Sequence, residues 1–170
     1  VTLVEADITG GVIENAYRLA KNSRKQQRKI PLCDIFPTPD KNQIAHKGQT
    51  LLPSNSFDYV ISVNLLNQLN ILIVDYLKTL GIYNQNELSA LSKAIQKHHL
   101  QILPKGKTSL ITDFEEVITN TKTNQSQKRP LVFVDLPESR HKQYWTWLFD
   151  TKQTYYAHHT TTFRVVAQNF

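Results

Sequence analysis

The chain has 170 residues, of which 40% are hydrophobic and 20% are charged, and its formal net charge at pH 7 is +6. This composition is typical of a soluble globular protein, and it excludes a membrane-spanning one because no apolar run approaches the roughly 20 residues that cross a bilayer. The single cysteine, Cys33, excludes an internal disulfide and a cysteine-only metal cluster, which favours a cytoplasmic protein.

In chain order, apolar β-branched segments alternate with amphipathic ones. The apolar segments predict strands at 1–6, 30–36, 57–63, 108–114, 131–136 and 161–170. The amphipathic segments predict helices at 10–26, 65–81, 84–103 and 114–124, the last fading into a polar loop. Most strand segments are near-continuous apolar runs, as in strands that are covered on both faces. We therefore expect a single α/β domain over residues 1–170, with a Rossmann-like, mostly parallel twisted sheet flanked by helices.

Some details of these elements can be predicted as well. The helix at 65–81 should end at Gly81, and residues 37–56 form a long loop rich in turn residues. The aromatic segment from Tyr144 to the C-terminus lacks a helix and predicts an antiparallel pair at the sheet edge, with Trp145 and Trp147 on one face. The first helix should bury one face made of Val12, Ile13, Ala16, Tyr17, Leu19 and Ala20.

The densest basic run is KNSRKQQRK at 21–29. A basic surface can attract nucleic acid, but no aromatic residues are interleaved in this run, as a base-stacking surface would need. The run therefore favours a solvated helix end and loop, and nucleic-acid binding is kept as an alternative only. We expect no membrane partner.

Polar residues stand at the carboxyl ends of the first three predicted strands, where an open α/β sheet binds its ligand. They are Glu5 and Asp7 after the first strand, Asp34 near the end of the second, and Ser62-Val63-Asn64 at the end of the third. Carboxylates there can accept hydrogen bonds from ribose hydroxyls or an adenine amino group, so the pattern fits a nucleoside-sized pocket. The alternative is that these acids cap helices.

The same segments resemble the class I S-adenosylmethionine-dependent methyltransferases. VTLVEADITGGVIENAYRLAK resembles that family's second strand and helix, IPLCDIF its third strand, and LLPSNSFDYVISVNLLNQL its fourth strand and helix. LPKGKTSLITDFEEV resembles the fifth strand, and the tail resembles the antiparallel sixth and seventh strands. The resemblance implies S-adenosylmethionine as cofactor and a small molecule or a protein as methyl acceptor.

The resemblance also implies roles for particular residues. Glu5 and Asp7 compete for the ribose, Asp34 and Ile35 lie on the adenine side, and Ser62, Val63 and Asn64 lie near the transferred methyl group. No G-x-G loop occurs in the chain, so we expect the family's first strand and glycine-rich loop to be missing from its N-terminal side. In the alternative, residues 1–11 are a degenerate first strand and loop.

No catalytic residue is named by the sequence, because methyl transfer needs little beyond in-line geometry. Asn67 and Gln68 are candidates for a direct role. The histidine pairs 98–99 and 158–159 are expected at the surface rather than on a metal, and the alternative for His158 or His159 is a general base near the pocket. The missing glycine loop leaves a non-catalytic interaction module as an alternative function. The aromatic residues near the C-terminus line an acceptor site or pack in the core and at the sheet edge; they are Tyr144, Trp145, Trp147, Tyr155 and Tyr156.

Overall fold

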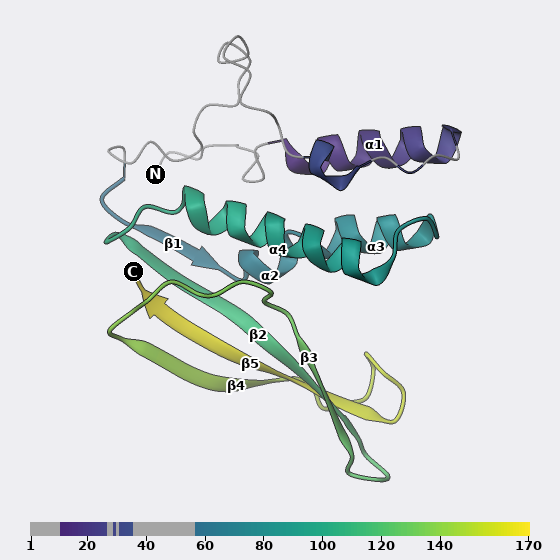
Figure 1. The fold of residues 1–170 in the computed structure, drawn as a ribbon. Coiled ribbons are helices and arrows are strands. Elements are labelled where there is room, and N and C mark those ends of the chain that lie inside the picture. Colours follow the sequence, from purple (N-terminus) through teal and green to yellow (C-terminus); the bar gives the residue numbers. More distant parts are fainter. Residues whose placement is uncertain (1–10, 27–28, 30, 36–56) are drawn as a thin grey trace. The chain divides into compact units, whose positions relative to one another are not determined.

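The computed structural model describes residues 11–26, 29, 31–35 and 57–170, without the side chain of Cys33. The chain divides into two compact units, each treated separately below. The helical unit contains residue 57, residues 68–103 and the described residues before 57, and the sheet unit contains residues 58–67 and 104–170 (Figure 1). No helix within the described ranges is long and apolar enough to cross a membrane.

The helical unit is built from α1 (Val12–Gln26), the 3-10 helix η1 (Leu32–Ile35), α3 (Ile71–Thr79) and α4 (Gln85–Ile102). Its core contains apolar side chains from all four elements, among them Ala16, Ile35, Leu77 and Ile95. The predicted helices at 10–26 and 84–103 are confirmed, because their apolar residues recur at helical spacing and pack into this core.

Two predictions for the start of this unit are wrong. The described residues of the predicted strand at 30–36 form the 3-10 helix η1, whose first turn is closed by a hydrogen bond from Asp34 N–H to the Pro31 carbonyl (3.1 Å). Ile13 and Tyr17 are exposed rather than buried. Tyr17 instead stacks on Tyr76 of α3, with ring centroids 5.8 Å apart, so the buried face of α1 is narrower than its sequence suggests.

The predicted helix at 65–81 is interrupted, and it forms α2 (Leu65–Gln68) and α3. The break lies at Asn70, whose buried amide donates to Ser92 (3.0 Å) and accepts from Gln96 (3.3 Å), both on α4. Its carbonyl accepts the first backbone bond of α3, from Val74 N–H (2.9 Å). Gly81, with φ of +67°, ends the segment as expected.

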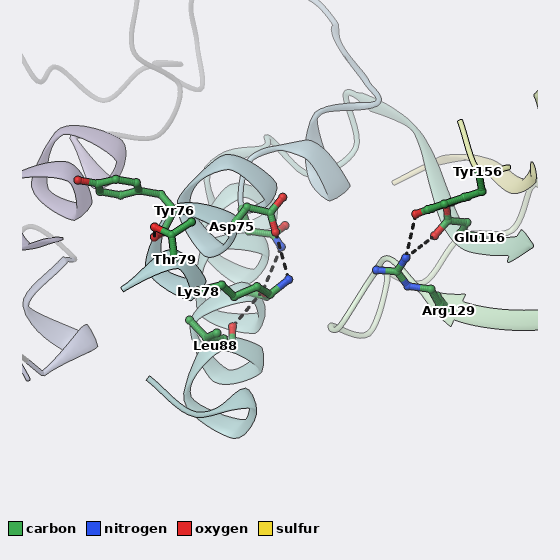
Figure 2. Close-up of polar contacts among 10 residues, drawn as sticks. Asp75, Tyr76, Lys78, Thr79, Leu88, Glu116, Arg129 and Tyr156 are labelled. Atoms are coloured by element: carbon green, nitrogen blue, oxygen red, sulfur yellow. Dashed lines mark hydrogen bonds and ion pairs between the residues drawn. The ribbon is translucent and has the colours of Figure 1, made fainter. Parts of the chain in front are cut away.

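Contacts between side chains also hold α3 together. Lys78 forms an ion pair with Asp75 (3.1 Å), and the Thr79 hydroxyl donates to the Tyr76 carbonyl (2.6 Å) (Figure 2). Because the Lys78–Asp75 pair is exposed to solvent, it contributes little to stability.

The start of α4 carries a capping box. The Asn84 side chain accepts a hydrogen bond from Glu87 N–H (3.0 Å), and the Glu87 carboxylate accepts one from Asn84 N–H (2.9 Å). These bonds satisfy two backbone donors that the first turn of a helix otherwise leaves without partners.

Replacing Asn84 by alanine is therefore expected to lower the free energy of unfolding by about 1 kcal/mol. Urea unfolding followed by circular dichroism measures this loss. The matched control is Asn86→Ala, because Asn86 is an exposed residue two positions further along the same turn and makes no capping bond. Equal losses in the two variants would contradict a capping role for Asn84.

The sheet unit contains five strands: β1 (Val60–Val63), β2 (Thr108–Asn120), β3 (Ser126–Pro130), β4 (Lys142–Asp150) and β5 (His159–Asn169). Their order is β1-β2-β5-β4, with β3 paired to β2 (Figure 1). β1 pairs with residues 108–111 of β2, and β3 pairs with residues 115–119. Because β5 occupies the other edge of β2, β1 and β3 share one edge of that strand.

The chain is thus an α/β protein with a mixed sheet, and the expectation of a mostly parallel sheet is wrong. Only β1 and β2 form a parallel pair among the described strands, whereas β2–β3, β2–β5 and β4–β5 are antiparallel. The strand predictions at 57–63 and 108–114 and the antiparallel pair at the end of the chain are confirmed.

The segment between β2 and β4 differs most from expectation. The predicted helix at 114–124 is strand instead, because β2 continues through Val117 and Ile118 to Asn120. The predicted polar loop forms a tight turn at Asn124 (φ of +57°) and then β3. The predicted strand at 131–136 is irregular, and a ladder-like bond runs from Leu131 N–H to the Phe114 carbonyl (2.9 Å).

Candidate functional site

The end of β1 carries the three predicted site residues of the sheet unit. Ser62 is buried and pairs with Leu110 of β2, while Val63 is exposed. Asn64 follows the strand with φ of +53°, and its backbone N–H donates to the Ile111 carbonyl of β2 (2.8 Å). Asn tolerates this left-handed conformation better than most residues, and such positions are frequent at functional sites. The predicted strand end is confirmed, and its ligand role stays a prediction.

A buried acid lies beside this strand end. Asp113 of β2 is 3% exposed, and its carboxylate accepts a hydrogen bond from the side chain of Asn67 in α2, which is also buried. Burial raises the pKa of Asp113 above its usual value, and the bond from Asn67 opposes that rise. The Asp113 carboxyl group is therefore easier to protonate than an exposed aspartate.

Three oxygens of this group have no hydrogen-bond partner among the described residues: Oδ1 of Asn64, Oδ1 of Asn67 and Oδ1 of Asp113. Asn64 and Asn67 follow the carboxyl end of β1, and Asn67 contacts Asp113, which lies in the middle of the neighbouring parallel strand β2. Thr161 and Gln168 of β5 also have such oxygens, but Asp113 is the acid of the set. Buried acceptors are rarely left without donors, so these three oxygens lack a partner that the described residues do not supply.

A second buried acid of the sheet, Glu116, has a structural explanation. Arg129 of β3 forms an ion pair with its carboxylate (3.2 Å) and donates to the Tyr156 hydroxyl (3.3 Å) (Figure 2). Burial raises the pKa of Glu116, and the Arg129 guanidinium opposes the rise. Glu116 is thus satisfied within the sheet unit, whereas one oxygen of Asp113 is not.

The remaining predicted residues lie elsewhere in the chain. Asp34 and Ile35 belong to η1 of the helical unit: Asp34 is exposed, and Ile35 is a fully buried core residue whose carbonyl accepts from Asn15 (3.2 Å). Glu5 and Asp7 lie outside the described residues. The structure therefore places Ser62, Val63 and Asn64 at the end of β1, and it brings Asn67, which follows them, into contact with Asp113.

Two outcomes concern residues that were not expected at the site or in the core. Asp113 was missed as a site residue, although a single acid in the otherwise uncharged SLITDF segment is a usable signal. His99 was expected at the surface, but it is 3% exposed. Burial lowers its pKa to about 4, with a smaller contribution from the charge of the neighbouring His98. No group of three or more histidine, cysteine or acidic side chains in the described part of the chain could hold a metal ion.

Replacing Asp113 by asparagine is expected to stabilise the ligand-free protein at pH 7. Because burial raises the pKa of Asp113, its charged form costs free energy in the fold, and this cost disappears as the pH falls through the raised pKa. The gain of Asp113→Asn should therefore be largest at pH 7 and vanish near about pH 3, below the usual aspartate pKa.

Chemical unfolding at both pH values measures this difference. The exposed Asp58, also in the sheet unit, provides the control Asp58→Asn, for which little change is expected. A gain at pH 7 that persists unchanged at low pH would show that the Asp113 charge is not its cause.

Comparison with known proteins gives no assignment, because no family model, no curated protein and no solved structure matches the chain. The resemblance to class I methyltransferases therefore stays a prediction.

Proposed function

We propose that the chain is an S-adenosylmethionine-dependent methyltransferase domain acting on a small molecule or a protein. The observation that carries the proposal is the set of buried acceptor oxygens of Asn64, Asn67 and Asp113. Asn64 and Asn67 follow the carboxyl end of β1, the end at which an α/β sheet binds its ligand, and Asp113 of β2 accepts a hydrogen bond from Asn67.

The strand order supports the same proposal. If β1, β2, β4 and β5 correspond to the family's fourth to seventh strands, the observed order reads 4-5-7-6. Both β2 and β4 run antiparallel to β5, so β1, β2 and β4 share one direction and the last strand is reversed between its neighbours. This is the arrangement of the C-terminal half of the class I methyltransferase sheet. We therefore propose that the sheet is a Rossmann-like one in which β3 is an addition.

The residues at the end of β1 fit the polar part of such a cofactor. The backbone from Ser62 to Asn64 would hold it, and the free side-chain oxygens beside it can accept hydrogen bonds from its amino group or from the methyl acceptor. S-adenosylmethionine supplies a methyl group that is already activated as a sulfonium. The task left to the protein is to align the acceptor, and Asp113, with its raised pKa, can receive a proton from an acceptor N–H or O–H group.

Calorimetric titration of the chain with S-adenosylhomocysteine tests the proposal. We expect binding that the variant Asn64→Gly weakens about tenfold, because glycine keeps the positive φ and removes the free oxygen. The matched control is Asn124→Gly, since Asn124 has a similar φ in the turn between β2 and β3. Absence of binding to the unmodified chain would refute the cofactor claim. Equal binding by both variants would show that the Asn64 side chain does not contact the cofactor.

A further inference from the structure

The strand β4 is an unusual edge strand because almost all of its side chains are exposed. Every residue of Lys142–Asp150 except Asp150 is exposed, and in the described sheet β4 pairs on one side only, with β5 (Figure 1). Trp145 and Trp147 are each 44% exposed. Natural sheets usually protect an edge with charges, proline or a bulge. Between Lys142 and Asp150 this strand carries no charged residue and no proline, and its one register shift against β5 lies at its end, between Leu148 and Asp150.

The exposed tryptophan rings of β4 share one face of the sheet with aromatic neighbours. Trp145 pairs with Val165 and Trp147 with Phe163 across β5, so both tryptophans lie on one face of the sheet. The Trp147 ring is 5.4 Å from that of Phe149 and 5.9 Å from that of Phe163, between centroids. Tyr144 and Leu148, also exposed, alternate with the tryptophans and project from the opposite face. A partner strand on the free backbone edge would therefore place its own side chains beside those on both faces.

We infer that β4 pairs antiparallel with β4 of a second copy of this chain, about a two-fold axis at Thr146. The sequence of the strand is nearly symmetric about that residue: Trp145 stands opposite the second copy's Trp147, and Tyr144 opposite its Leu148.

This pairing gives partners to both the backbone groups and the side chains of the exposed edge. It satisfies the outward backbone groups of both strands with hydrogen bonds. It gathers four tryptophans on one face of the joined sheet, and two tyrosines and two leucines on the other. A single strand of nucleic acid stacked on the tryptophans would cover only one face and would leave the backbone edge free. The inference goes beyond the proposed function and does not depend on it.

The mass of the chain in solution, from analytical ultracentrifugation, is the first test. We expect twice the 19.6 kDa of one chain for the wild type. We expect monomers for the double variant Trp145→Lys/Trp147→Lys and for Trp145→Glu/Trp147→Glu, because each places like charges opposite one another. Mixing the two variants should restore a dimer, which an unfolded variant could not do. Leu72→Lys, at an 80% exposed leucine of the helical unit, should leave the dimer intact.

A disulfide tests the register. In a Cys33→Ser background, Thr146→Cys places two cysteines opposite each other at the two-fold axis, within the range that a disulfide bridges. Gln143→Cys on the same strand places them about 20 Å apart. We expect an oxidised dimer for Thr146→Cys and none for Gln143→Cys. A monomeric wild type, failure of the charged variants to recombine, or a wild-type monomer whose tryptophan fluorescence is quenched by single-stranded oligothymidine would overturn the inference.

Discussion

Replacing Leu110 by alanine is expected to lower the free energy of unfolding by about 3 to 5 kcal/mol, the largest loss we expect for a single substitution in this chain. Leu110 is fully buried in β2, and its strand neighbours are Ser62 of β1 and Gln168 of β5. Truncation removes apolar burial and leaves a cavity that flanking strands on both sides cannot easily close. Guanidinium unfolding followed by tryptophan fluorescence measures the loss, because both tryptophans lie in the sheet unit.

Leu72→Ala is the matched control, because the same atoms are removed from an 80% exposed side chain. Its loss should stay within about 0.5 kcal/mol, as for most surface substitutions. A loss below about 1 kcal/mol for Leu110→Ala would mean that β2 does not pack in the sheet core as the structure shows.

The elements predicted correctly are those whose pattern is local. The helices α1 and α4 show helical spacing over many residues, and α4 adds a capping signal at Asn84. The segment of β1 is short, apolar and β-branched, and it precedes polar residues. In each case the sequence within a few residues already decides the conformation, so no distant contact is needed to predict it.

The failures concern segments whose conformation depends on distant partners. Residues 114–124 place Phe114, Val117 and Ile118 at helical spacing, yet the chain is strand there because β5 and β3 pair with it on both edges. Residues 131–136 are apolar enough for a strand, but they extend no strand ladder beyond Pro130. Pairing partners far along the chain determined the conformation of the first segment against its local preference, and the described strands form no ladder with the second.

The candidate site was predictable in position but not in composition. The carboxyl end of β1 follows from reading a strand up to Ser62-Val63-Asn64. Asp113 could not be assigned to the same place, because its neighbourhood depends on the parallel register of β1 with β2 and on Asn67 after the strand. Only with this register known can Asp113 be assigned to the same polar group as Asn67.

Acidification is expected to destabilise the chain through His99. Burial, followed by the charge of His98, lowers the pKa of His99 from 6.5 to about 4, so the folded protein keeps it neutral over a range in which the unfolded chain binds a proton. The free energy of unfolding is therefore unaffected by His99 above pH 6.5, and it decreases as the pH falls from 6.5 towards 4. A pKa difference of this size corresponds to a loss of roughly 3 kcal/mol.

The variant His99→Gln isolates this contribution, because glutamine stays polar and does not titrate. Its free energy of unfolding should fall less than that of the wild type between pH 7 and pH 4, whatever its stability at pH 7, by an amount close to the roughly 3 kcal/mol assigned to His99. His98→Gln on the same helix, at a residue that is only half-buried, should leave most of the pH dependence in place. If the unfolding curves of the wild type and His99→Gln shift in parallel with pH, His99 is protonated equally in the folded and unfolded states, and its burial in α4 carries no electrostatic cost.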